Sequence, residues 1–280
     1  MQSSTVLSRG GSHRREHLCW TYGRPEEFTD RAREFLAEGL AAGERVLYVG
    51  RDAPGALARQ LCTTRAFDDG VRSGAVRTAS LTSTYPFEAV VDPHEQVRNY
   101  AAATEEALAA GFSGLRVAAD ATPLVRTAVQ LDAFARYEHL VDRYMTTRPL
   151  SAMCAYSRAE LGDDAIAQLA CLHPWASAGA TPFRLHATTD GEISAVLDGE
   201  LDSGSHELWP VALERAGLRP VAGAVVIDAT GLDFIDHRGL LTLADTADRL
   251  GANVVLRTRL SQPARVLELL NVTSVSVEQV

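Results

Sequence analysis

Hydrophobic positions along the chain follow two alternating patterns, short apolar runs and longer stretches with a helical period. The short runs predict strands at 18–22, 45–50, 75–80, 115–119 and 150–156. In the longer stretches apolar residues recur every three or four positions, and these predict helices at 24–43, 53–64, 92–110, 129–147 and 159–171. Loops are expected after the second helix, through Gly70, and at 82–91. Strands that alternate with long helices predict a mainly parallel sheet covered by helices on both faces.

A second set of elements follows a small-residue segment with a proline at 177–182, which we interpret as a linker. Further strands are expected near 183–188, 193–201, 223–228, 253–257 and 275–279, with helices near 204–216, 239–250 and 262–270. A length of 280 residues suits two domains. We therefore expect a disordered tail at 1–14, a first α/β domain at 15–176 and a second, smaller α/β domain at 183–280.

Composition and charge exclude several classes of function. The chain has a net charge of -9 and no long basic patch, which argues against a nucleic-acid partner. Its apolar runs have strand length, so we expect no membrane span and no membrane partner. The polar N-terminus lacks the apolar core of a signal peptide, and the four cysteines show no CxxC spacing. We expect a cytoplasmic protein with reduced thiols and no cofactor.

The stretch from 225 to 250 organises the second half of the chain. It opens with an apolar strand that ends in Asp228, and a short loop is expected at 229–234. Asp236 then stands at the N-cap position of a helix whose apolar residues have helical spacing. A strand, a short loop and an exposed helix N-terminus together suit an anion or an acidic partner.

This stretch resembles the signature of STAS domains, the family of anti-sigma-factor antagonists. The resembling residues are Asp228-Ala229-Thr230-Gly231, Phe234-Ile235 and Asp236-His237-Arg238-Gly239, with Leu197-Asp198-Gly199-Glu200-Leu201-Asp202 before them. The resemblance implies a surface that binds an anti-sigma factor or a kinase-like regulator, formed by Asp202, Asp228, Thr230, Asp233, Asp236, His237, Arg238 and Gly239. Regulated members of the family are phosphorylated on a hydroxyl at the positions that His237 and Arg238 occupy here, so that switch is not expected.

The first domain resembles the MEDS family, a sensory domain named for methanogens, methylotrophs and a dichloromethane-responsive regulator. The resemblance is carried by His17-Leu18-Cys19, the segment 35–49, Gly114-Leu115-Arg116-Val117, Met153-Cys154-Ala155-Tyr156 and His173-Pro174. It implies a RecA-like P-loop fold and the sensing of a small molecule.

A working P-loop needs Gly-x4-Gly-Lys-Ser/Thr after a strand. After the strand at 45–50 comes Arg51-Asp52-Ala53-Pro54-Gly55, without the Lys and the Ser/Thr. We therefore expect no ATP hydrolysis and, because no Ser or Cys stands in a nucleophile-elbow pattern, no enzyme. The loop position still favours a pocket, since ligands of open α/β sheets bind at the carboxyl ends of the strands.

Candidate residues for a ligand pocket come from several of the expected elements. They are His17, Cys19, Arg51, Arg116, Asp120, Cys154, Tyr156 and His173. Two histidines and two cysteines among them have the chemistry of metal ligands, but Cys19 is early in its strand and Cys154 is late in its own. We expect these two at opposite edges of the sheet, and interpret the cysteines as buried apolar residues rather than as a metal site. Arg116 and Arg126 are expected near the end of the fourth strand with Asp120, and Glu138 on the following helix. These residues belong either to a buried polar network, which we favour, or to a site with a ligand-orienting arginine.

The leading hypothesis is a signalling protein whose sensory domain gates the STAS surface. Capture of an anti-sigma factor at that surface would free a sigma factor. Two alternatives stay open: a degenerate P-loop protein that binds nucleotide, and a scaffold that gathers other STAS proteins. The sequence also leaves open a homo-oligomer.

Overall fold

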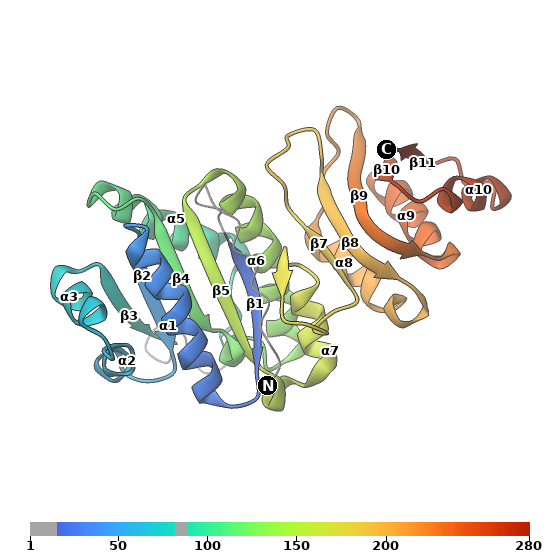
Figure 1. Ribbon diagram of the computed structural model, residues 1–280. Coiled ribbons are helices and arrows are strands. Elements are labelled where there is room, and N and C mark those ends of the chain that lie inside the picture. The colour runs from blue at the N-terminus through green and yellow to red at the C-terminus, as the bar shows by residue number, and fades with distance from the viewer. Residues whose placement is uncertain (1–15, 82–88) are drawn as a thin grey trace.

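The computed structural model describes residues 16–81 and 89–280. The tail expected at 1–14, and residues 82–88 of the expected loop, lie outside the described residues. Two sheets follow one another along the chain, each with its own helices (Figure 1).

The first sheet has six strands, all parallel to their neighbours, in the order β3-β2-β4-β5-β1-β6. The strands are β1 (His17–Tyr22), β2 (Arg45–Gly50), β3 (Val76–Ser80), β4 (Leu115–Asp120), β5 (Leu150–Ser157) and β6 (Trp175–Ala176). Residues on the two faces alternate along each strand, so Cys154 and Tyr156 point to one side while Met153 and Ala155 point to the other. The predicted parallel α/β sheet is confirmed.

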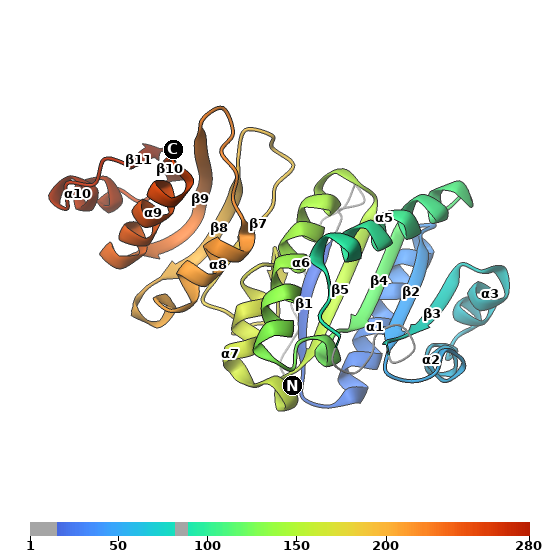
Figure 2. The same cartoon turned by 180° about the vertical axis from the view of Figure 1, so that it is seen from behind.

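Helices cover both faces of this sheet. They are α1 (Pro25–Ala41), α2 (Pro54–Leu61), α3 (Arg65–Ser73), α5 (Pro93–Ala109), α6 (Ala128–Thr147) and α7 (Arg158–Ala170). The first three pack on one face, in front in Figure 1, and α5, α6 and α7 pack on the other, in front in Figure 2. A short 3-10 turn, Thr122–Leu124, precedes α6.

Three details of the first domain differ from the expectations. The helix expected at 53–64 ends at Leu61, and the loop expected through Gly70 is helix α3. Gly70 does not end the helix. Because it has no side chain, it lets α3 lie against Val76 of β3. The helix ends instead at Gly74, which has a φ of 78°. The two-residue strand β6 was not expected.

The second sheet has five strands in the order β11-β10-β9-β8-β7, parallel except for the β7–β8 pair. They are β7 (Phe183–His186), β8 (Ala195–Leu201), β9 (Ala224–Ile235), β10 (Asn253–Thr258) and β11 (Val275–Gln279). The helices are α8 (Leu208–Ala216), α9 (His237–Leu250) and α10 (Gln262–Leu269), with a 3-10 turn at Ser203–Ser205.

Strand β9 corrects the expected loop at 229–234, because the strand continues to Ile235. Its second half pairs with β8, where Asp198 lies opposite Gly231 and Glu200 opposite Phe234, with register shifts that absorb extra residues. A Cβ at Gly231 would overlap the Asp198 carboxylate, so glycine lets the two strands stay together. The turn-like composition of this segment therefore marks an irregular strand rather than a loop.

The two halves share one continuous hydrophobic core. Helix α8 packs on α6 and α7, and Leu185 N of β7 donates to Cys171 O at 2.6 Å. The expected linker also lies against the first sheet, since Thr21 N donates to Ser177 Oγ at 2.9 Å and Ser177 N donates to Cys19 O at 3.0 Å. Within the described ranges, no helix is long and apolar enough to cross a membrane.

Replacing Gly199 with alanine should lower the free energy of unfolding by about 2 kcal/mol or more. Gly199 has a φ of 95°, and a Cβ there would meet the Pro182 carbonyl oxygen and come within 2.9 Å of Phe183 Cα. Chemical denaturation of the full chain followed by circular dichroism measures the effect. Gly191→Ala is the control because a Cβ there meets no atom within 4 Å; equal loss in both variants would contradict the argument.

Candidate functional site

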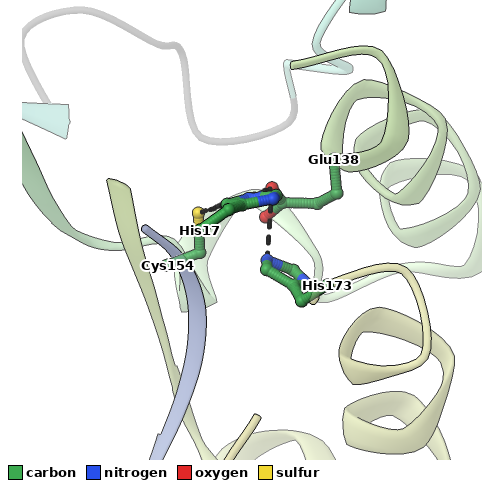
Figure 3. A group of neighbouring side chains, drawn as sticks. All are labelled: His17, Glu138, Cys154 and His173. Atoms are coloured by element: carbon green, nitrogen blue, oxygen red, sulfur yellow. Dashed lines mark hydrogen bonds and ion pairs between the residues drawn. The ribbon is translucent and has the colours of Figure 1, made fainter. Parts of the chain in front are cut away.

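A buried cluster of four polar side chains lies between the first sheet and helix α6. His17 comes from β1, Cys154 from β5, Glu138 from α6, and His173 follows α7 (Figure 3). All four are buried, and Glu138 and His173 have no exposed surface. Such groups are costly inside a core unless they satisfy one another, so the cluster is a built feature of the fold.

Strand order and register bring these residues together. Strands β1 and β5 are neighbours, and Cys19 lies directly opposite Cys154. The expectation that the two cysteines stand at opposite edges was wrong, because β5 begins two residues before the partner of His17 and so reaches Cys154 at the level of Cys19. His17 and Cys154 thus face α6 from adjacent strands.

Glu138 is the centre of the cluster. Its Oε2 lies 3.1 Å from His17 Nε2 and 3.5 Å from His173 Nε2, and it accepts from Cys154 Sγ at 3.4 Å. Its other oxygen accepts a hydrogen bond from the Tyr156 hydroxyl. Burial raises the pKa of Glu138, but the two imidazoles outweigh burial and hold that pKa well below its usual value. Glu138 is therefore a carboxylate.

Both histidines are oriented by a second contact through Nδ1. His17 Nδ1 lies 3.0 Å from Asp142 Oδ1, and His173 Nδ1 lies 2.9 Å from the Leu169 carbonyl oxygen. Burial lowers the pKa of His17, but Asp142 and Glu138 together raise it to about 9. The pKa of the Cys154 thiol is raised by burial and by Glu138. In both rings Nε2 is left facing the centre of the cluster.

The cluster is connected to the second domain through Asp142. The other oxygen of this side chain accepts a hydrogen bond from Ala187 N at 2.7 Å, directly after β7. Burial raises the pKa of Asp142, and the contacts with His17 outweigh that effect and lower it.

A separate group of polar residues occupies the carboxyl ends of the strands, where a P-loop ligand would bind. Arg51 Nε donates to Asp120 at 2.6 Å, Arg51 also pairs with Glu160 at 2.7 Å, and the Tyr22 hydroxyl donates to Asp120 at 2.9 Å. Burial and the Asp120 carboxylate raise the pKa of Tyr22. Two carboxylates beside Arg51 make this crevice unfavourable for phosphates.

Arg116 lies at the opposite end of the sheet from Arg51. It is the second residue of β4, so it is not near the end of the strand with Asp120 as expected, and it pairs with Glu44 at 2.6 Å and with Glu16 at 3.1 Å. The candidate pocket residues therefore occupy three places: the buried cluster with Tyr156 and the adjacent Cys19, the crevice with Arg51 and Asp120, and the Arg116 ion pairs.

An apolar cavity of about 310 Å³ lies between the sheet and helices α5 and α6. Its lining includes Val49, Tyr100, Val117, Phe134 and Cys154. Of the pocket candidates taken from the sequence, Cys154 lines this cavity, so the cavity and the buried cluster share one side chain.

The N-terminus of α9 is capped as expected. Asp236 Oδ1 accepts from Gly239 N at 2.9 Å, and its Oδ2 lies 2.6 Å from His206 Nε2. Burial raises the pKa of Asp236, but the hydrogen bonds from Gly239 and His206 outweigh burial and hold it below its usual value. Because the Asp236 side chain already accepts from the helix end, fewer free amide groups remain for an additional anion than expected.

A groove of about 220 Å³ runs beside this helix end. Its lining residues are Ser205, His206, Trp209, Arg238, Gly239, Leu241, Thr242 and Asp245. Trp209 of α8 is fully buried at its base, and its Nε1 donates to Gly239 O at 3.2 Å. Leu241 is 37% exposed, so the groove presents an apolar side chain beside charged ones.

The expected partner-binding residues do not all lie at this groove. Asp202 follows β8 and is adjacent to Asp236, since Asp236 N donates to Leu201 O at 2.9 Å. Asp228 and Thr230 lie in the middle of β9, where the Asp228 side chain accepts from Thr230 N. Asp236 is eight positions after Asp228, which corresponds to roughly 26 Å of path along an extended strand. Asp233, His237 and Arg238 are exposed near the helix end.

Two central residues were not among the site candidates from the sequence: Glu138, which was considered only for a polar network near Arg126, and His206. Glu138 stands in the apolar stripe of its helix, four residues after Phe134 and three before Val141, and an acid in that phase is a signal that could have identified it. His206, which pairs with Asp236, has no such signal because the two are brought together by the end of β8.

Comparison with known proteins distinguishes the two halves of the chain. The family described as "MEDS: MEthanogen/methylotroph, DcmR Sensory domain" matches residues 16–174. The chain belongs to the MEDS family. The matched range comprises the first five strands of the six-stranded sheet, ends directly before the short edge strand β6, and contains the whole buried cluster.

The C-terminal region of this MEDS protein has a relative of its own. It is 37% identical over 91 residues to a protein of Mycobacterium tuberculosis (strain ATCC 25618 / H37Rv) named "Putative anti-anti-sigma factor Rv2638". The match spans 30% of the present chain and 62% of that relative's length. It agrees with the expected order of a MEDS domain followed by a STAS domain, and together the two matches support a signalling regulator.

Replacing Asp236 of the MEDS protein with alanine should lower the free energy of unfolding by about 1 kcal/mol at neutral pH. Because the folded pKa of Asp236 is depressed, this contribution is present above the unfolded value of about 3.9 and is lost as pH falls through the folded value. Urea unfolding of both proteins should show the difference shrinking in acid.

Asp233→Ala is the matched control, since Asp233 is exposed and the structure describes no hydrogen bond or ion pair for it. A difference between Asp236→Ala and the wild type that grows in acid would contradict the assignment of Asp236 as a charged cap.

Proposed function

We propose that this chain is an anti-sigma-factor antagonist-like signalling protein in which the MEDS domain gates the STAS domain. The observation that carries the proposal is the position of α8. This helix packs on α6 of the MEDS domain and also forms the base of the groove at the N-terminus of α9. A change in the MEDS domain that moves α8 therefore changes the groove.

The contact between α6 and α8 is held by charge as well as by apolar packing. Arg215 of α8 is buried, and its Nε donates to Asp132 of α6 at 3.0 Å. Arg136 of α6 pairs with Glu214 of α8 at 2.7 Å. A buried guanidinium must keep its partner, because loss of one member leaves an uncompensated charge. This requirement supports a helix α8 whose position depends on the position of α6.

The groove supports binding of an anti-sigma factor or a related kinase-like regulator. It combines the exposed Leu241, the cation Arg238 and the acid Asp245 around a buried tryptophan. Interfaces commonly have such an apolar anchor within a charged rim. Capture of the anti-sigma factor there would release the sigma factor that it holds.

Control by phosphorylation at the usual loop is not part of the proposal. His237 and Arg238 follow the cap residue and carry no hydroxyl. Control passes instead to the MEDS domain, whose small-molecule signal is the input. We expect no catalytic activity.

Nucleotide binding is the weaker alternative. The crevice that would receive phosphates contains Asp120 and Glu160, both paired with Arg51. A scaffold for other STAS proteins is the remaining alternative, and it predicts binding to STAS domains instead of to an anti-sigma factor.

Replacing Leu241 with arginine should weaken binding of a purified anti-sigma factor from the source organism by roughly tenfold or more, because it removes the apolar anchor. Isothermal titration calorimetry with the full chain measures the affinity. Leu269→Arg is the control, since Leu269 is 70% exposed on α10. Unchanged binding by Leu241→Arg, or binding of STAS proteins alone, would overturn the proposed surface.

A further inference from the structure

Four potential metal-ligand atoms converge inside the MEDS domain. One atom each from His17, Glu138, Cys154 and His173 lies within 4.8 Å of all the others. The four residues come from β1, α6, β5 and the segment after α7, so the whole first domain is needed to assemble them. Figure 3 shows the two rings, the carboxylate and the thiol directed at one another.

The outer contacts of the histidines are those that metal ligands require. A metal-binding imidazole donates its other ring N–H to a carboxylate or a backbone carbonyl, which orients the ring and leaves a lone pair for the ion. His173 Nδ1 lies 2.9 Å from Leu169 O, and His17 Nδ1 lies 3.0 Å from Asp142. Tyr156 likewise holds the outer oxygen of Glu138. Every histidine and the carboxylate in the group thus has an outer partner.

His173 provides an independent indication of a ligand. This residue has no exposed surface, and its Nε2 has no hydrogen-bond partner among the described residues. Glu138 Oε2 lies 3.5 Å from this nitrogen, as an ion-pair neighbour rather than a hydrogen-bond partner. A buried ring nitrogen without a partner destabilises the folded state. A cation between the four groups would give Nε2 a partner at the point to which it is directed.

We propose that His17, Glu138, Cys154 and His173 bind one divalent transition-metal ion, with zinc the expected ion. One sulfur, two imidazole nitrogens and one carboxylate oxygen make a four-ligand set typical of zinc, whereas calcium and magnesium take oxygen ligands. Cys154 binds as the thiolate and His17 as the neutral imidazole: the thiol proton and the proton on His17 Nε2 leave to solvent as the bonds to the ion form. The ion then replaces the direct contacts among the four side chains.

Two ligand contacts link the proposed site to other parts of the molecule, namely the apolar cavity and the second domain. Cys154 also lines the apolar cavity of the MEDS domain, and Asp142, which holds His17, accepts from Ala187 N of the second domain. Metal binding itself is independent of the partner groove, so it can be tested without an anti-sigma factor.

The test is metal uptake by the untagged, chelator-treated full chain. Zinc content after dialysis against zinc should be about one ion per chain by mass spectrometry of the elements. Cobalt(II) alone serves as the spectroscopic probe, because a bound thiolate gives a sulfur-to-cobalt charge-transfer band. Cys154→Ser should abolish the band, and His173→Gln should weaken cobalt binding by roughly tenfold or more. Circular dichroism confirms that each variant folds.

Cys62→Ser is the matched control, because Cys62 is a half-buried thiol outside the cluster and should leave uptake unchanged. The alternative is a metal-free network in which His17 bridges Glu138 and Asp142. A wild-type chain that takes up neither zinc nor cobalt would establish that alternative and overturn the proposal. A charge-transfer band that survives Cys154→Ser but is lost in Cys62→Ser would overturn it as well.

Discussion

The need to satisfy buried charges on helix α6 is the constraint on which the rest of the structure depends. Glu138 has no exposed surface and Asp142 is nearly as buried, and both find partners in His17 at the start of β1. On a neighbouring part of the helix, Asp132 receives the buried Arg215 of α8. A buried charge without a partner costs several kcal/mol. The position of α6 is therefore restricted relative both to β1 and to α8.

This constraint gives the two domains a physical connection. Asp142 contacts Ala187 N in the second domain, while α8 extends from the α6 contact to the groove, where Trp209 holds the first turn of α9 through Gly239 O. A shared hydrophobic core fills the space between them. In the proposed mechanism, displacement of α6 by an occupant of the MEDS domain would reach the groove through α8 and would also change the Asp142 contact with the second domain.

Local patterns predict most of the elements, because strand and helix periods are imposed by burial of one face. They do not predict which strands become neighbours. The cluster was therefore only partly predicted: His17, Cys154 and His173 were pocket candidates and Glu138 was not, and the meeting of His17 with Cys154 depends on the pairing of β1 with β5. The long strand β9 was mistaken for a strand and a loop for the same reason, since its second half is held by β8 and by the close approach at Gly231. Tertiary pairing overrides turn composition there.

In the proposed mechanism the α6–α8 contact controls the partner groove. The most direct test is the affinity of the full chain carrying Asp132→Ala for an anti-sigma factor. This change removes the carboxylate that pairs with Arg215 and Arg136 but leaves every groove residue in place. If this contact controls the groove, the affinity for the anti-sigma factor should change by about fivefold or more. The control is Asp30→Ala, whose carboxylate pairs within α1. Affinity within about twofold of the wild type, in a folded Asp132→Ala protein, would contradict the claim.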